Sequence, residues 1–126
     1  MFKLSKQRVI FIVTHGEEFK ERLEPPIHLA TLTALLDAEV KMVFTMSAGL
    51  LLKKGTPENL LPLGKEKTYL ETLKEAKEVG VKIYVCSPVL EMYNLKREDF
   101  IDEVDDIVGG MFLVTESLEA DVTYTF

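Results

Sequence analysis

Hydrophobic positions along the chain fall into short runs that predict buried strands. Residues 8–14, 40–45 and 81–86 are predominantly apolar and rich in β-branched side chains, a pattern typical of strands in a covered parallel sheet. Residues 121–126 alternate between polar and apolar and predict a strand with one more polar face. Residues 105–108 predict one further short strand.

Helical segments separate these strands. Pro25 and Pro26 open a helix that reaches about Asp37, because proline is tolerated in the first helical turn. Residues 65–79 have the apolar spacing of an amphipathic helix, and Gly80 ends it. Shorter helices are predicted beyond Ser87 and at residues 50–54, 98–104 and 110–118.

The order of these elements predicts the fold class. Strands that alternate with helices pair in parallel through right-handed crossovers. We therefore predict a three-layer α/β/α sandwich with a mainly parallel sheet of four or five strands. The 126 residues fit one domain, residues 1–126, whose core needs neither a disulfide nor a structural metal.

The helix that follows Pro25 is apolar almost all round. Such a helix must be covered on more than one side, and a neighbouring subunit is one way to cover it. The composition of this helix is thus consistent with oligomerisation. His28 lies inside this helix, where a structural or subunit-contact role is expected rather than catalysis.

Composition narrows the class of protein. The formal net charge of −6 argues against a nucleic-acid-binding surface, which needs clustered Lys and Arg. The apolar run 9–13 is too short for a signal sequence or a membrane span, and no other segment approaches that length. One cysteine excludes an internal disulfide and favours a reducing compartment. The expected location is the cytoplasm, with neither membrane nor nucleic acid as partner.

That cysteine, Cys86, ends a predicted strand. Ser87 is a good helix N-cap and Pro88 a good first helical residue, so a helix is expected directly beyond the thiol. The N-terminus of a helix favours the thiolate, which is the nucleophilic form of cysteine. The alternative is that Cys86 is a small buried hydrophobe, as many free cysteines are.

Three predicted strand ends carry the candidate site. Ligands of open parallel sheets bind outside the carboxyl ends of the strands, which here are residues 14–16, residues 45–47 and Cys86–Ser87. His15 is therefore a candidate neighbour of Cys86 that would take its proton or pair with the thiolate. The alternative is a loop histidine that hydrogen-bonds locally.

Small residues follow the strand at 40–45 and the strand at 105–108. The turns 47–49 and 108–110 can receive a small anion, or they are only tight connections from strand to helix. No glycine-rich nucleotide fingerprint and no metal-ligand spacing is present, so we expect neither a cofactor nor a metal. The predicted substrate-binding residues are Thr14, Gly16, Ser47, Gly49 and Ser87.

Several groups of residues match one family pattern in order and spacing. They are the strand 9–14 with its His15–Gly16 turn, Glu24-Pro25-Pro26 before an Ala/Leu-rich helix, 43–45 followed by 49–55, the strand-terminal Cys86, the run 95–101 before 108–110, and the closing segment 120–126. Together they resemble the DsrE/DsrF family of small sulfur-handling proteins over nearly the whole chain. Residues 88–94 depart from the small-residue and glycine pattern of that family.

The resemblance implies an α/β fold, assembly into homotrimers or homohexamers, and sulfur-relay activity. In active members a cysteine at the position of Cys86 carries sulfane sulfur as a persulfide. The leading hypothesis is a sulfur carrier or sulfurtransferase that accepts sulfur on Cys86, with His15 assisting. Because the chain has no second cysteine, the acceptor thiol must belong to a partner protein or a small thiol.

Two other functions fit the same sequence. A non-catalytic oligomeric module would bind a small ligand at the strand ends and would keep Cys86 buried and inert. A thiol redox sensor would form a sulfenic acid or an intersubunit disulfide at Cys86.

Overall fold

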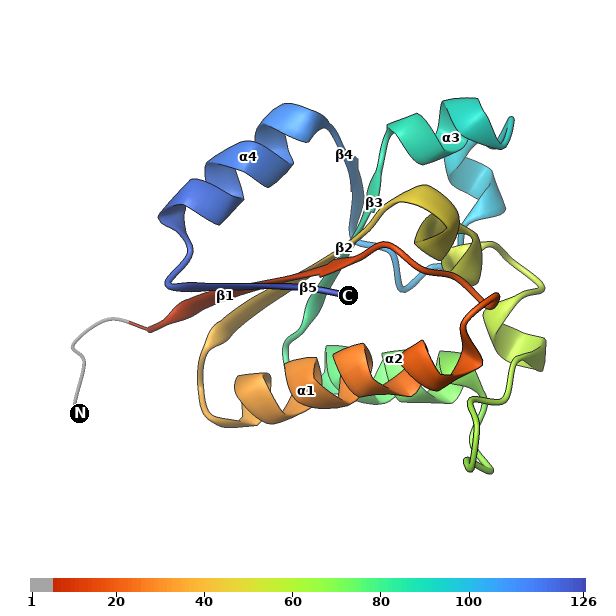
Figure 1. Cartoon of the computed structure of the whole chain (residues 1–126), viewed down its shortest axis with the longest axis horizontal. Coiled ribbons are helices and arrows are strands. Elements are labelled where there is room, and N and C mark those ends of the chain that lie inside the picture. Colours follow the sequence, from red (N-terminus) through yellow and green to blue (C-terminus); the bar gives the residue numbers. More distant parts are fainter. Residues whose placement is uncertain (1–5) are drawn as a thin grey trace.

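Strands and helices alternate along residues 6–126, the part of the chain that the computed structural model describes (Figure 1). The strands are β1 (Arg8–Val13), β2 (Glu39–Phe44), β3 (Lys82–Cys86), β4 (Asp106–Val108) and β5 (Val122–Thr125). The α-helices are α1 (Glu24–Leu35), α2 (Tyr69–Glu78), α3 (Pro88–Met92) and α4 (Gly110–Glu119). Single turns or short stretches of 3₁₀-helix lie at Lys20–Arg22, Met46–Leu52, Pro57–Asn59 and Arg97–Asp99.

The five strands form one sheet in the order β4-β3-β2-β1-β5. Every pair is parallel, so each connection crosses over the sheet. The predicted α/β sandwich with a mainly parallel sheet is confirmed.

The two faces of the sheet are covered unequally. Helices α1 and α2 lie along one face, whereas α4 crosses the other (Figure 1). The main core lies on the α1/α2 face and includes Phe11, Phe44 and Leu73, which are fully buried. A much smaller cluster lies on the α4 face and contains Val43, Cys86 and Val108, against which Tyr84, Phe112 and Leu113 pack.

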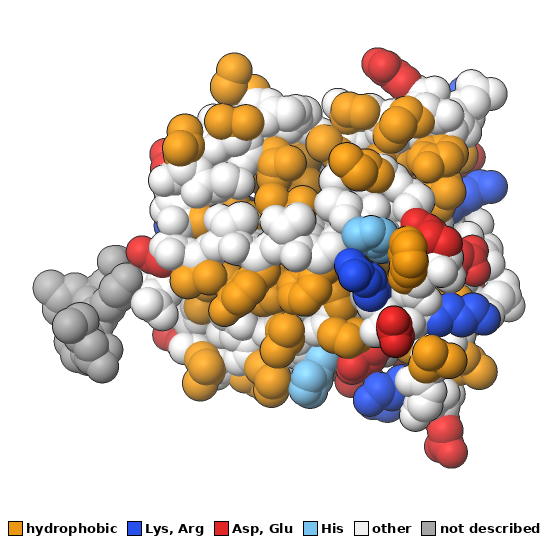
Figure 2. Space-filling model, viewed as in Figure 1, with side chains coloured by type: hydrophobic (Ala, Val, Ile, Leu, Met, Phe, Trp, Pro, Cys, Tyr) orange, Lys and Arg blue, Asp and Glu red, His pale blue; other side chains and the backbone are white. Residues whose placement is uncertain are grey.

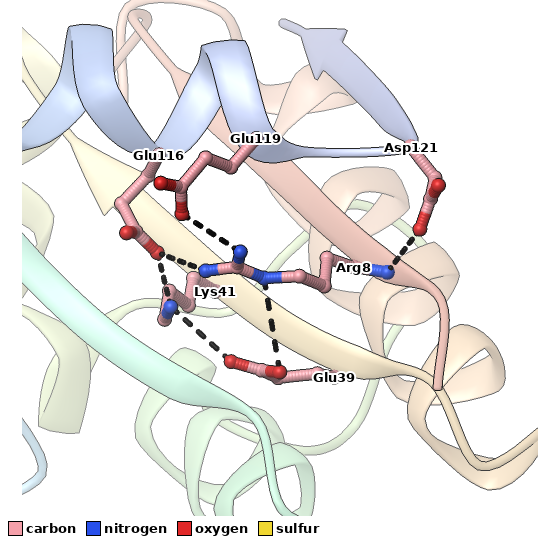
Figure 3. Close-up of polar contacts among 6 residues, drawn as sticks. All are labelled: Arg8, Glu39, Lys41, Glu116, Glu119 and Asp121. Carbon is pink, nitrogen blue, oxygen red and sulfur yellow. Dashed lines mark hydrogen bonds and ion pairs between the residues drawn. The ribbon is translucent and has the colours of Figure 1, made fainter. Parts of the chain in front are cut away.

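Helix α4 is tied to the sheet by an ion-pair cluster as well as by apolar contacts. Arg8 at the start of β1 donates to Glu119 at 2.8 Å and lies 3.4 Å from Glu116. Lys41 of β2 also donates to Glu116. Figure 3 shows Arg8 of β1 and Lys41 of β2 converging on these glutamates of α4. The α4 ion-pair cluster comprises Arg8, Glu39, Lys41, Glu116, Glu119 and Asp121.

Helix α2 begins four residues later than the apolar spacing predicts. Thr68 accepts a hydrogen bond from the Glu71 backbone N–H at 3.2 Å, and the Glu71 carboxylate accepts from the Thr68 N–H at 3.3 Å. This capping box satisfies otherwise unpaired backbone donors and fixes the start of the helix. Residues 65–68 precede it as a bent loop.

The helix predicted at residues 98–104 is wrong beyond a single 3₁₀ turn. Phe100 is extended and pairs with Lys53 in an isolated antiparallel bridge. The Ile101 N–H donates to the Leu52 carbonyl at 2.9 Å. Backbone pairing with a segment some fifty positions away, which local spacing does not encode, thus replaces helical hydrogen bonds here.

Within residues 6–126, no helix has the length and apolar character that a membrane crossing requires.

Candidate functional site

The carboxyl ends of β1, β2 and β3 lie along one edge of the sheet, as predicted for a ligand-binding edge. His15 follows β1 and Cys86 ends β3, with β2 between them. Since neighbouring strands are about 4.8 Å apart, the strands that carry His15 and Cys86 are about 10 Å apart. The fold places the two residues at the same edge but on strands that are not adjacent.

Cys86 lies beneath the N-terminal half of α4. Its side chain is only 5% exposed and contacts the apolar cluster with Val43 and Val108. Phe112 and Leu113 of α4 pack against that cluster from above. The thiol therefore faces hydrocarbon in this conformation.

Ser87 precedes α3 but does not cap it. Its backbone is already helical, with φ −57° and ψ −34°, and its side chain makes no capping hydrogen bond. Instead, its N–H donates to the Val108 carbonyl at 2.7 Å, which joins the end of β3 to β4. The predicted helix start at Pro88 is confirmed, and the predicted capping role of Ser87 is wrong.

His15 hydrogen-bonds to its neighbour. Its Nδ1 lies 3.1 Å from the Thr14 hydroxyl, and that hydroxyl donates to the Phe126 carbonyl at 2.7 Å. The Thr14 oxygen therefore accepts from His15 Nδ1–H, which leaves Nε2 as the acceptor of the neutral ring. The His15 ring also meets Phe19 edge to face at 4.9 Å. These contacts match the local hydrogen-bonding alternative for His15.

Gly16 and Ser47, which were predicted to bind substrate, do come together. The Gly16 N–H lies 3.1 Å from the Ser47 hydroxyl and 3.1 Å from a Glu18 carboxylate oxygen. The Ser47 hydroxyl donates to the same carboxylate at 2.5 Å and lowers the pKa of Glu18. The carboxylate of the chain itself thus occupies the donors available to a small anion.

Sequence reasoning did not identify Glu18. Its signal is an acidic side chain two residues after a strand-end glycine, close enough to bond back to that glycine's N–H. Gly16 itself is tightly enclosed, because a Cβ there would lie 2.7 Å from the Ser47 carbonyl oxygen. The position requires glycine for this close approach.

Gly49 serves packing. It is buried in the 3₁₀ segment, and a Cβ on it would lie 2.5 Å from Cγ1 of Val89 in α3. The absence of a side chain lets the 3₁₀ segment approach the helix that follows Cys86. Gly49 thus helps to fix the position of α3, which directly follows the end of β3 at Cys86 and Ser87.

A cavity lined largely by polar and charged side chains lies away from these residues. It has a volume of about 500 Å³ and lies between α1 and the loop before α2, with Glu24, His28 and Lys65 among its lining residues. In the described part of the chain, no group of three or more His, Cys, Asp or Glu side chains is placed to hold a metal ion. The candidate chemical site remains the strand-end edge, because that is where Cys86 lies.

Comparison with known proteins gives both a family and relatives. The sequence profile of the DsrE/DsrF-like family matches residues 7–123. An uncharacterized protein of Methanocaldococcus jannaschii is 35% identical over 92 residues, which cover 72% of this chain and 75% of that protein. An uncharacterized protein of Methanopyrus kandleri is 30% identical over 98 residues, which cover 77% and 76%.

Solved structures agree on the fold. The ychN protein from E. coli superimposes with a TM-score of 0.77 at 18% identity, and the match covers 97% of this chain and all of that one. Together with the family match over residues 7–123, the parallel sheet and its order of helices lead to one assignment. The chain belongs to the DsrE/DsrF-like family.

Proposed function

We propose that this protein is a sulfur carrier that accepts sulfane sulfur on Cys86 and passes it to an acceptor thiol. The family and the fold suggest a sulfur-relay role. The observation that carries the proposal is the position of the cysteine, at the carboxyl end of a central parallel strand. That edge is where open parallel sheets place their chemistry.

The transfer is a pair of thiol–disulfide-like exchanges. After Cys86 loses its proton to solvent, its thiolate attacks the outer sulfur of a persulfide or of thiosulfate. The donor's S–S bond breaks, the donor leaves as a thiolate or as sulfite, and Cys86 holds a persulfide. An acceptor thiolate then attacks the terminal sulfur and releases the Cys86 thiolate. Cys86 is the sole cysteine, so the acceptor comes from another molecule.

One observation favours a second candidate function. Cys86 is almost fully buried under α4. A non-catalytic module that binds a small ligand at the strand ends requires such an inert thiol. The two functions differ in whether Cys86 ever forms a bond to sulfur.

We expect the protein to gain the mass of one sulfur atom when it is incubated with thiosulfate, polysulfide or a persulfidated thiol. The measurement is intact-protein mass spectrometry before and after treatment with a reductant, which should remove the gain completely. Cys86→Ala and Cys86→Ser should show no gain, because neither variant retains a thiol.

The opposite results separate the candidates. A wild-type protein that never gains sulfur and whose thiol also resists alkylation in the native state would favour the binding module. A thiol that alkylates readily but takes no sulfur from any donor would exclude the carrier and favour a redox sensor.

We further propose that the protein assembles into a homotrimer or homohexamer. Leu29, Leu32 and Leu35 of α1 are exposed although the helix is apolar almost all round, and so is Leu36 directly after it. Val122 and Tyr124 of β5 are also partly exposed. Figure 2 shows hydrophobic side chains along β5 and on α1 below it. Contiguous apolar surface of this kind typically marks a protein–protein interface.

The substitutions Leu32→Glu and Leu35→Glu are each expected to dissociate the oligomer into smaller species. Both side chains are exposed, at 44% and 62%, so the charge would disturb a subunit contact and leave the core intact. Light scattering coupled to size-exclusion chromatography measures the mass. Leu61→Glu is the matched control, since Leu61 is 52% exposed but lies in the loop before α2. A wild-type monomer at micromolar concentration would contradict the proposal.

A further inference from the structure

We infer that α4 is a movable cover over Cys86, and that the α4 ion-pair cluster sets how often the thiol is exposed. The inference rests on the proposed function for its purpose, because a sulfur carrier needs access to its thiol. In the closed conformation Cys86 is 5% exposed beneath Phe112 and Leu113. A donor molecule cannot reach the sulfur until those two side chains leave the cluster.

Apolar packing holds α4 only weakly. None of its ten residues is fully buried. On its outer side Met111, Val114 and Leu118 are 79%, 56% and 82% exposed, at the spacing of one helical face. An element that buries little apolar surface opens at low cost in free energy.

The contact between α4 and the thiol cluster is also small. Its main aromatic contribution is the Phe112 ring, which lies 5.0 Å from the ring of Tyr84. Beneath them the cluster has only three buried members. By comparison, the core on the opposite face continues over β1, β2 and β3 and under two helices. Local opening of α4 can therefore occur while the rest of the fold stays intact.

Charged side chains also tie the helix to the sheet. Lys41 and Glu116 are only 16% and 14% exposed, and Lys41 also lies 3.3 Å from Glu39. Burial disfavours the charged lysine, but hydrogen bonds to Glu116 and Glu39 outweigh it and raise the pKa of Lys41. Arg8 binds Glu119 at 2.8 Å, as Figure 3 shows. If α4 lifts, these partly desolvated pairs must separate.

The backbone before α4 is suited to such a movement. Gly109 and Gly110 join β4 to the helix, and a Cβ on Gly110 would meet no atom within 4 Å. Neither glycine has a positive φ that would exclude another residue. Packing therefore does not require glycine at position 110. The backbone freedom of Gly109 and Gly110 would let them act as a hinge about which α4 moves.

The test is the rate at which iodoacetamide, a small uncharged alkylating reagent, modifies Cys86 in the native protein. We expect the wild type to react at least about tenfold more slowly than the urea-unfolded chain, because reaction waits for α4 to open. Glu116→Gln should accelerate it about fivefold to tenfold, since it weakens the ion pairs without touching Cys86. Gly110→Ala should slow it by stiffening the hinge.

Two controls separate opening of α4 from other causes. Glu75→Gln removes an exposed ion pair on the other face of the sheet, in which Glu75 of α2 lies 2.6 Å from Lys67. This variant should leave the alkylation rate unchanged. Added salt should accelerate the wild type and have less effect on Glu116→Gln, because this variant lacks the two Glu116 pairs and keeps only the Arg8–Glu119 pair between α4 and the sheet. The alkylation rate of Cys86 should depend on urea concentration far more weakly than global unfolding does.

Several results would overturn the inference. They are a wild-type rate equal to that of the unfolded chain, equal effects of Glu116→Gln and Glu75→Gln, or a rate that follows global unfolding. Failure of the proposed function is distinguishable from these. A gated thiol that never takes up sulfur would leave the cover in place and exclude the carrier. If the rate of sulfur uptake is the same in the wild type and in Glu116→Gln, the protein is a carrier but α4 does not control access to Cys86.

Discussion

Replacing Phe11 by alanine is expected to lower the free energy of unfolding by about 3–5 kcal/mol. Phe11 lies in the middle of β1, is 0% exposed, and has Met42 and Tyr124 as its partners on the neighbouring strands. Its ring centroid is 5.0 Å from that of Tyr124 and 6.3 Å from that of Phe126. The substitution would leave a cavity in the core and deprive β5 of its aromatic contact.

Urea unfolding monitored by circular dichroism measures this change. Phe11→Leu keeps most of the buried volume and should cost less than about 1.5 kcal/mol. Phe19→Ala is the exposed control, because Phe19 is 46% exposed, and should lie within about 0.5 kcal/mol of the wild type. A loss below about 1 kcal/mol for Phe11→Ala would show that the α1/α2 core does not depend on this ring.

Gly49→Ala is expected to destabilise the protein by about 1–3 kcal/mol through overpacking. The new Cβ would lie 2.5 Å from Cγ1 and 2.8 Å from Cγ2 of Val89. Val89 is 0% exposed and β-branched, so its side chain has few rotamers in which to withdraw. Relief would require α3 or the 3₁₀ segment to move, which would disturb the strand end at Cys86.

A double-mutant cycle tests this mechanism. Val89→Ala removes both clashing methyl groups, so Gly49→Ala should cost at least about 1 kcal/mol less in that background than in the wild type. Gly110→Ala is the matched control, because an added Cβ there meets nothing within 4 Å, and it should be neutral or slightly stabilising. Strict additivity of the Gly49 and Val89 substitutions would rule out the clash.

The strands could be predicted well from the sequence. Val9–Val13 and Ile83–Cys86 are short apolar runs with clear boundaries, and in the structure they form central parallel strands. Errors arose where distant segments decide local structure. The segment after Asp99 is extended because Ile101 pairs with Leu52, and no local pattern contains that information.

Part of the candidate site was also predictable. A residue that ends a parallel strand must lie at the ligand-binding edge, so the placement of Cys86 followed from its position at the end of a predicted strand. The separation of His15 from Cys86 depends on which strand lies between them, and the cover over the thiol depends on which face α4 crosses. The strand order and the position of α4 are properties of the fold's topology. The residue types near Cys86 do not determine them.

The return of β5 to the side of β1 has a consequence for how the chain folds. Asp121 and Arg8 exchange hydrogen bonds although 113 positions separate them, whereas β1, β2 and β3 are joined through α1 and α2 by far shorter connections. Closing so long a loop costs more chain entropy and slows folding. We therefore expect the β1–β3 half of the sheet to form first, with α4 and β5 completing it later.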